Sequence, residues 1–301
     1  MKKILIPALL VSAMFASEQN YIEIGGGAIN YKDNFSTESN KNISNLGSAK
    51  SETEGIPSVN FYYGYDLNES INIYATSEMG DLNIGSSFET DYGFFDIGLK
   101  GNTGEEWENP FLTGVNREKT DTKEFGAYIG YGFSLSEDSE SMIRYEFSKK
   151  SYDEDGVIKD LKRDGNRHVL ALENMYNINL FDKESALISN LFYEKYDADG
   201  KSSSYNEYGL ELGVSSQIME NTNLFLLTNY GKKDYHKFNS EVNKKVDVDI
   251  YGITAGIRVD KPFDYENTYV SFTTGFEKEK ANVDFYDKEN SFGLVSVGYK
   301  F

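Results

Sequence analysis

Apolar and polar residues alternate with a period of two along most of this chain, in segments of about ten residues. Successive side chains of a β-strand point to opposite faces, so such segments predict strands with one apolar and one polar face. The clearest segment is 207–218, where an apolar set alternates with a polar or small one: Tyr208, Leu210, Leu212 and Val214 against Glu207, Gly209, Glu211 and Gly213.

Fourteen such strands are predicted over the chain. They are 21–31, 57–66, 70–79, 92–100, 109–116, 124–133, 142–150, 167–179, 186–196, 207–218, 223–231, 249–259, 268–277 and 291–301. The fifth has the weakest pattern, and it follows 102–108, which contains the only tryptophan, Trp107, and is expected to form a turn. If 109–116 is not a strand, the expected count falls to twelve.

The predicted connections alternate in length. Those after even-numbered strands are mostly short (67–69, 136–140, 220–222), whereas those after odd-numbered strands are longer and more charged (36–55, 152–164, 232–245, 279–290). This alternation indicates a meander of hairpins with short turns at one end and long loops at the other. Loop 36–55 is the longest, and it could either fold inward or splay outward as a binding surface.

The last predicted strand carries Val295, Val297, Tyr299 and Phe301 on one face. It resembles the C-terminal sorting signal of bacterial outer-membrane β-barrels, which typically ends in Phe; Ser296 stands where the stricter signal has Gly. The resemblance implies an all-β fold over residues 18–301, a transmembrane antiparallel up-and-down β-barrel of fourteen strands. It also implies contact with outer-membrane lipid and lipopolysaccharide, and recognition of the C-terminal strand by the barrel-assembly machinery.

The first 17 residues read as a signal peptide. Lys2 and Lys3 are followed by an apolar run, 4–11, and by small residues up to Ser17, with cleavage expected after Ala16 or Ser17. The sequence thus predicts export to the periplasm and localisation in the outer membrane. No later apolar run approaches the roughly 18 to 20 residues that a membrane helix needs.

Composition narrows the function classes. A formal charge of −19 disfavours binding to nucleic-acid phosphates, and the absence of cysteine excludes disulfides, thiolate metal sites and a lipoprotein anchor. The chain has 23 Tyr and 20 Phe but only 4 Pro, as expected of a membrane barrel with aromatic girdles.

The polar faces of the predicted strands carry more acid than base, which favours a pore that concentrates cations. The acidic candidates for pore-lining residues are Glu78, Asp96, Glu124, Glu146, Glu173, Glu194, Glu207, Glu211 and Glu277, and the basic ones are Lys100, Arg144, Arg167 and Arg258. The chain resembles small single-chain general porins, which implies passive diffusion of ions and small hydrophilic solutes, as a monomer or a trimer.

Two alternatives stay open at this point. The lumen charges could pair across strands and plug a structural or adhesive barrel that acts through its outer loops. A substrate-specific porin for a small sugar or acid could instead use a track of aromatic lumen residues, for which the candidates are Tyr62, Tyr74, Tyr128 and Phe192.

The sequence offers little catalytic chemistry. His168 shares a face with leucines and is expected to face lipid, and His236, although close to Asp234, lies in a charged segment. The Asp-rich tips 153–156 and 197–200 have the chemistry of hairpin turns and lack the later bidentate Glu of a calcium loop. We therefore expect no enzyme activity, no metal and no cofactor, and we read 25–27 as a bend or a small lumen position.

Overall fold

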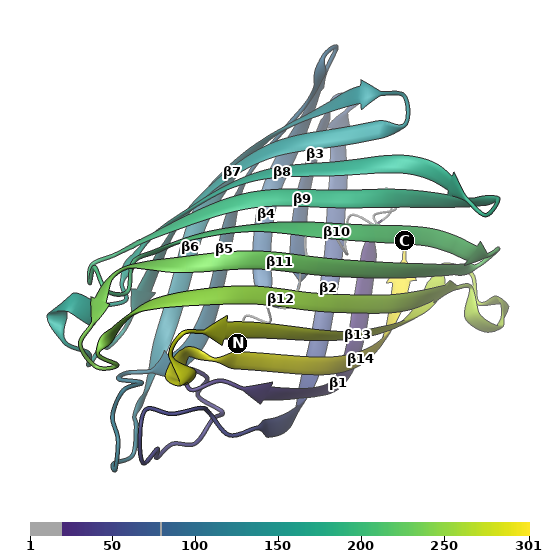
Figure 1. Ribbon diagram of the computed structural model, residues 1–301. Helices are drawn as coiled ribbons and strands as arrows, with labels where there is room; N and C mark the ends of the chain where they lie inside the picture. Colours follow the sequence, from purple (N-terminus) through teal and green to yellow (C-terminus); the bar gives the residue numbers. More distant parts are fainter. Residues whose placement is uncertain (1–19, 79) are drawn as a thin grey trace.

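The protein forms a closed antiparallel β-barrel in which every strand pairs with its neighbours in the chain (Figure 1). The structure is a computed structural model, and it describes residues 20–78 and 80–301. Over these residues fourteen strands follow one another around the barrel, and β1 pairs with β14 from Tyr21↔Lys300 to Lys32↔Glu289 to close it. The predicted fold class and strand number are therefore confirmed. The predicted signal peptide, 1–17, lies outside the described residues.

The strands are longer than their apolar segments suggested. Their bounds are β1 Tyr21–Lys32, β2 Glu52–Asn68, β3 Ile71–Glu78, β4 Asp81–Thr90, β5 Gly93–Trp107, β6 Lys119–Ser136, β7 Ser139–Tyr152, β8 Gly165–Leu180, β9 Lys183–Ala198, β10 Tyr205–Met219, β11 Thr222–Asn239, β12 Lys244–Asp260, β13 Thr268–Ala281 and β14 Lys288–Lys300. Three short 3₁₀ helices, η1 Lys159–Leu161, η2 Pro262–Asp264 and η3 Asp284–Tyr286, lie in the connections of this described part.

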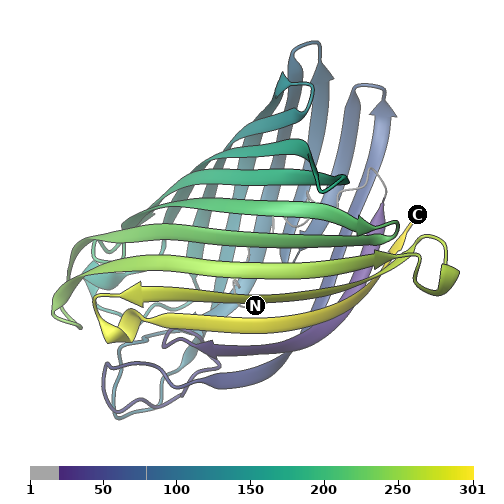
Figure 2. The ribbon, with the colours of Figure 1, turned by 45° about the vertical axis from the view of Figure 1, so that its right-hand side comes forward.

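The two ends of the barrel differ as the connection lengths predicted. The end that holds the C-terminus has mostly short turns, whereas the opposite end gathers longer loops, 33–51, 108–118, 153–164, 199–204 and 282–287 (Figure 2). At the turn end the amide of Phe301 donates to the carbonyl of Asn20 at 2.9 Å, which keeps both ends of the described chain together. In outer-membrane barrels the short turns are periplasmic, so we call the loop end the outer end.

Two of the strand predictions were wrong, and the two errors cancel in the number of strands. Segment 109–116, predicted as a strand, is part of loop 108–118, while 81–90, left without a strand, forms β4. The outward row of β4 is Leu82, Ile84, Ser86 and Phe88, so a serine interrupts its apolar pattern. The predicted turn 102–108 is the end of β5, where Trp107 is only 1% exposed.

The predicted loop 232–245 is also wrong, because β11 and β12 continue through most of it. The polarity of the two faces reverses along β12. Near the turn end Ile253 faces outward and Gly252 inward, but near the outer end Val246 faces inward, buried, and Asp247 outward. Lipid surrounds only the lower part of the strand, and water surrounds the upper part. The apolar side chains therefore change face where the strand leaves the membrane.

The face predicted for the terminal strand points outward. Val295, Val297, Tyr299 and Phe301 are 53%, 56%, 48% and 58% exposed, as expected of side chains that face lipid. Tyr299 and Phe301 stack with 6.4 Å between ring centroids. Recognition of this strand by assembly machinery stays a prediction.

Inward-facing aromatic rings lie flat over inward-facing glycines. A Cβ on Gly98 would be 2.3 Å from the Tyr128 hydroxyl, and a Cβ on Gly275 would be 2.5 Å from the Phe292 ring. The same arrangement places Phe225 over Gly256. Because a glycine leaves room for a neighbouring ring against the wall, large aromatic side chains can line the barrel without crossing its lumen.

Gly98→Ala should destabilise the barrel by about 1–3 kcal/mol, because the new methyl group would overlap Tyr128 and the carbonyl of Ile84. Gly293→Ala is the matched control, since a Cβ there meets nothing within 4 Å. The measurement is the temperature at which each folded barrel loses its fast mobility on unboiled gels. Equal temperatures for the two variants would contradict the packing argument.

Candidate functional site: a loop lid over a charged lumen

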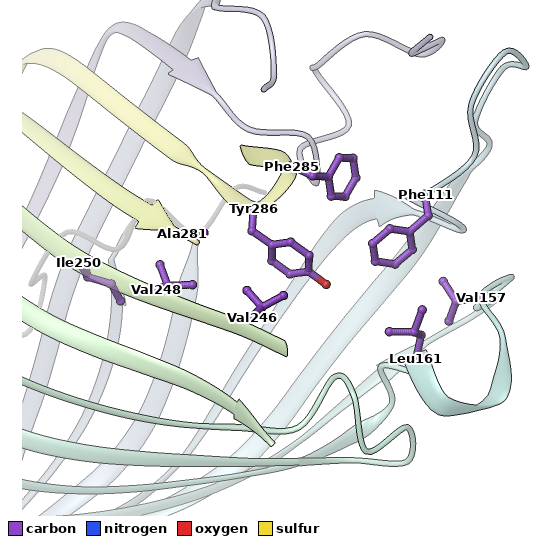
Figure 3. Packing of buried hydrophobic residues seen from close by; sticks show 9 residues of the cluster. All are labelled: Phe111, Val157, Leu161, Val246, Val248, Ile250, Ala281, Phe285 and Tyr286. Carbon is purple, nitrogen blue, oxygen red and sulfur yellow. The ribbon is translucent and has the colours of Figure 1, made fainter. Parts of the chain in front are cut away.

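An apolar cluster closes the outer end of the barrel (Figure 3). It joins loop residues to the inward-facing upper parts of β12 and β13. Its buried members are Phe111, Val157, Leu161, Val246, Val248, Ile250, Ala281, Phe285 and Tyr286. We call this cluster, with the loops 33–51, 108–118, 153–164 and 282–287 that build it, the lid. Burial of these side chains away from water is what holds the loops together.

Loop 33–51 folds inward over the mouth of the barrel. Phe35 packs against Phe285, Phe111 and Tyr286 with ring centroids 5.4, 6.2 and 5.0 Å apart. The side-chain amide of Asn34 donates to the carbonyl of Phe285 at 3.0 Å. Of the two arrangements left open for the longest loop, the structure therefore has the inward one. The last residues of the predicted loop, 52–55, belong to β2.

Arg117 ties loop 33–51 to loop 108–118. Its guanidinium is fully buried and donates to the carbonyls of Asn34 at 2.7 Å and Pro110 at 3.2 Å. It also donates to the Ser39 hydroxyl at 3.2 Å, and it lies 4.4 Å from the centre of the Trp107 ring. Burial lowers the pKa of Arg117 to about 10, so the group remains charged at neutral pH.

A second arginine fixes loop 153–164. Arg163 binds the Asp155 carboxylate at 2.7 and 2.9 Å, donates to the carbonyl of Glu108 at 2.7 Å, and lies 4.3 Å from the centre of the Tyr152 ring. The acidic tip 153–156 is thus held by an internal ion pair.

Below the lid, ion pairs between nearby strands run along the wall of the lumen. Arg144 lies 3.3 Å from Asp96 and 3.7 Å from Glu173, and Lys100 pairs with Glu146. The other contacts of this kind are Arg167 with Glu194 at 2.5 Å and with Glu124 at 3.7 Å, and Lys233 with Glu207 at 3.0 Å and with Glu279 at 3.5 Å. A buried charge is costly unless it is paired, so these contacts stabilise the wall on which they lie.

The structure places the predicted lumen residues on the inward faces of their strands and brings most of them into this network. Arg258 pairs instead with Asp260 at 2.8 Å, near the turn end. Glu211 accepts a hydrogen bond from the Asn190 amide at 2.9 Å. Within the described residues, neither Glu211 nor Glu277 has a basic group within 4 Å. Glu78 makes its own contacts at the outer tip of β3.

Sequence reasoning missed three inward-facing lysines. Lys150, Lys233 and Lys288 all lie near the outer ends of strands and pair with Glu106, Glu207 and Glu279. Two of these partners, Glu106 and Glu279, were not predicted as lumen residues either, so most of the predicted excess of acid over base remains. Extending the two-residue alternation of β11 beyond Gly231 would have placed Lys233 on the inward face.

Three of the four candidate stacking residues come together. Tyr62 and Tyr74 stack with centroids 6.0 Å apart, and the Tyr74 hydroxyl bonds to Asp96 at 2.5 Å and to the Tyr128 hydroxyl at 2.7 Å. Phe192 is separate and lies over Gly209. The rings of Tyr62, Tyr74 and Tyr128 therefore line one stretch of the lumen wall, where the Tyr74 hydroxyl contacts Asp96.

The turn end of the lumen opens into a cavity of about 860 Å³. It is lined mainly by hydroxyl and amide side chains of β8 to β11, among them Asn177, Asn179, Ser215 and Gln217. Asp138 and Glu184 also line it and no basic residue does, in contrast to the ion pairs above.

The described residues supply no catalytic or metal-binding constellation. His168 faces outward, where its Nδ1 lies 2.8 Å from the Tyr145 hydroxyl. In this part of the chain no three His, Cys, Asp or Glu side chains are placed to hold a metal ion. A search of the same residues for a helix of membrane-spanning length and apolarity also finds none.

Comparison with protein families gives one match, which extends over residues 19–300 and is described as a protein of unknown function, DUF2860. The chain belongs to the DUF2860 family. A comparison with curated proteins gives no match.

Solved structures similar to this DUF2860 chain are outer-membrane barrels. A FadL homologue of Pseudomonas aeruginosa has a TM-score of 0.54 at 10% identity, with 96% of this chain and 92% of that one covered. The monoaromatic hydrocarbon channel CymD (0.52, 9%) and the toluene transporter TodX of Pseudomonas putida (0.52, 12%) each cover 99% of this chain and 92% of their own. At such identities the likeness shows a shared fold.

Arg117→Met should loosen the lid while the barrel stays closed, because its hydrogen bonds join two loops and no strand pair. We expect the lid to lose about 3 kcal/mol and loop 33–51 to be cleaved on the order of a hundredfold faster. Limited proteolysis with an unboiled gel measures both effects. Lys41→Met is the control, since the Lys41 side chain is exposed and lies 3.8 Å from Glu118, while its backbone hydrogen bond to Arg117 is kept. Equal cleavage rates would refute the role of Arg117.

The burial of Asp33 predicts that the stability of the lid depends on pH. Burial raises the pKa of Asp33, although Lys288 and the amide of Phe35 oppose the rise. A carboxyl whose pKa is raised on folding favours the protonated lid, so lid stability should increase as the pH falls from neutral toward the ordinary Asp value.

Hydrogen exchange of loop 33–51, corrected for intrinsic rates, should therefore be slower at pH 4.5 than at pH 7. Asp33→Asn should give slow exchange at both pH values, whereas the exposed control Asp160→Asn should keep the wild-type difference. A wild-type pH dependence in Asp33→Asn would count against this assignment.

Proposed function

We propose that this protein is a gated outer-membrane channel for ions and small hydrophilic solutes, with a preference for cations. The observation that carries the proposal is the polar lumen beneath the lid. A barrel of about eight strands is filled by its own side chains, and one of sixteen to eighteen encloses an aqueous channel. Here the rings lie flat over glycines and the charged side chains are paired along the wall, both of which favour a lumen wide enough for water.

The cavity at the turn end also supports a channel for hydrophilic solutes. Its amide and hydroxyl lining would solvate a small polar solute, and its two acidic residues, Asp138 and Glu184, would favour a cation. Solutes would pass between this cavity and the outer end, where the lid must move. The lid is the gate of the proposed channel, because its apolar cluster joins loops from separate hairpins that can part without breaking strand pairing.

The cation preference rests on the acids that the wall leaves without a basic partner. Glu211 and Glu277 face the lumen from β10 and β13, and no lysine or arginine among the described residues lies within 4 Å of either. When they are ionised, carboxylates without a basic partner on a low-dielectric wall attract cations. The paired acids contribute less, since their lysines and arginines cancel most of their field.

Two observations favour other functions. The closed apolar lid fits a non-conducting surface barrel that acts through its outer loops. The apolar lid also fits the entry of an apolar molecule at the outer end. Two similar structures are described as a monoaromatic hydrocarbon channel and a toluene transporter. The ion-paired lumen below the lid disfavours passage of a hydrocarbon along the barrel axis, so we rank the hydrophilic channel first.

Conductance in a planar bilayer under a salt gradient tests the proposal. We expect rare cation-preferring openings for the wild-type chain and frequent ones for Arg117→Met, because that change loosens the gate. The double change Glu211→Gln and Glu277→Gln should lower the cation preference. Glu137→Gln with Glu220→Gln, in the short turns, is the matched control of equal charge. Folded Arg117→Met that never conducts would reject the channel and favour the surface barrel.

A further inference from the structure

One row of inward-facing residues crosses six neighbouring strands, β9 to β14, and contains no basic side chain (Figure 1). Strand pairing places its members directly opposite one another from each strand to the next. The row, which we call the acid–amide row, consists of Asn190, Glu211, Asn229, Gly252, Glu277 and Asn290. On β13 it lies two inward positions below Ala281 of the lid, and on β10 two inward positions above Ser215 of the turn-end cavity. The row therefore connects the lid with the cavity.

Most polar side chains of this row have no partner in the protein. Glu277, Asn229 and Asn290 make no hydrogen bond or ion pair within residues 20–78 and 80–301. Glu211 is 7% exposed and accepts one hydrogen bond, from the Asn190 amide, whose own Oδ1 is buried and unpartnered in the same part of the chain. Buried polar groups normally have such partners, as the ion pairs elsewhere on the wall do. These oxygen atoms are therefore available to a solute.

A phenylalanine ring lies beside each of the two acids. Phe192 covers the glycine at the inward position before Glu211, and a Cβ there would be 2.6 Å from the ring. Phe292 covers the glycine at the inward position before Glu277, where a Cβ would be 2.5 Å from the ring. A carboxylate attracts an ammonium group by charge, and a ring face attracts it through its quadrupole. Each acid thus has the surroundings of a subsite for an amine.

The two acids are separated by a stretch of wall with few side chains. Glu211 and Glu277 lie three strands apart, which is about 14 Å along a sheet with about 4.8 Å between strands. Between them lie the Asn229 amide and Gly252, which has no side chain. A compact cation can contact only one of these acids, whereas an elongated solute with an amine at each end can contact both.

We propose that the acid–amide row binds linear aliphatic polyamines, with one ammonium group at Glu211 and another at Glu277. The methylene chain between them lies over Gly252, and the oxygens of the Asn190 and Asn229 amides accept hydrogen bonds from the ammonium groups. The absence of lysine and arginine from the row disfavours an anionic solute at this place. The proposal rests on the proposed channel, for which it names a class of solute.

Calorimetric titration of the folded, full-length mature chain in detergent tests the site without a current. Diaminodecane and diaminoethane both carry two charges, but only the longer one reaches from Glu211 to Glu277. We expect diaminodecane to bind on the order of tenfold more tightly, because one more charge-assisted hydrogen bond contributes about that factor. Glu211→Gln and Glu277→Gln should each remove this advantage. Glu69→Gln with Glu137→Gln, at exposed turn positions, should bind like wild type.

Phe192→Leu is a second variant, which keeps every charge. It should weaken diaminodecane binding about threefold through the lost ring contact. Equal affinities of the two diamines for the wild-type chain, or equal weakening of both by Glu277→Gln, would indicate general attraction of cations and overturn the proposal. Unboiled gels establish that every variant is folded before its binding is compared.

The outcomes for the site and for the channel can be told apart. A chain that prefers diaminodecane but never conducts in a bilayer would reject the channel and support the site. A chain that conducts but does not distinguish the two diamines would reject the site and support the channel.

Discussion

The pairing of β1 with β14 is the interaction on which the rest of the molecule depends. In hydrocarbon each unpaired backbone amide or carbonyl costs several kcal/mol, so a sheet can cross a membrane only when it has no edge. At this pairing the two strands approach closely because β1 has glycine there. A Cβ on Gly27 would be 1.9 Å from the carbonyl oxygen of Gly293. Gly25 and Gly27 face inward and are small because the two strands approach closely, which fits the small lumen position expected for this run, whereas Gly26 faces outward.

Once the wall is closed, the alternation of side chains divides the molecule into three environments. Outward residues of the lower barrel meet lipid, inward residues near the turn end meet water, and inward residues near the outer end meet the loops. Each environment selects its own chemistry: leucine and tyrosine on the lipid face, paired charges and amides in the lumen, valine and phenylalanine under the lid. The same strand, β12, passes through all three.

Sequence reasoning predicts most of the wall and little of the lid. A two-residue period is a local signal, so strands such as β6 and β10 could be placed. The acids that face the lumen could then be identified from their alternate positions along each strand. The lid depends on contacts between residues far apart in the chain, such as Arg117 with Asn34, and no period marks them. Strand β4 and Lys233 were missed for a related reason. The outward neighbours of Lys233 are polar, and the outward row of β4 is interrupted by Ser86, so the apolar half of the pattern is broken although each strand continues.

The reversal of polarity along β12 also separates the part of the barrel that faces lipid from the part that holds the loops. Bilayer thickness and lateral pressure act on the lower barrel, where rigid hydrogen-bonded strands resist them. The apolar core of the lid sits above that level, on strand ends whose outer faces carry Lys245, Asp247 and Asp249 and so stand in water. The packing of the loops therefore depends on the water-facing upper barrel and on the pH there, and not on the lipid-facing part below it.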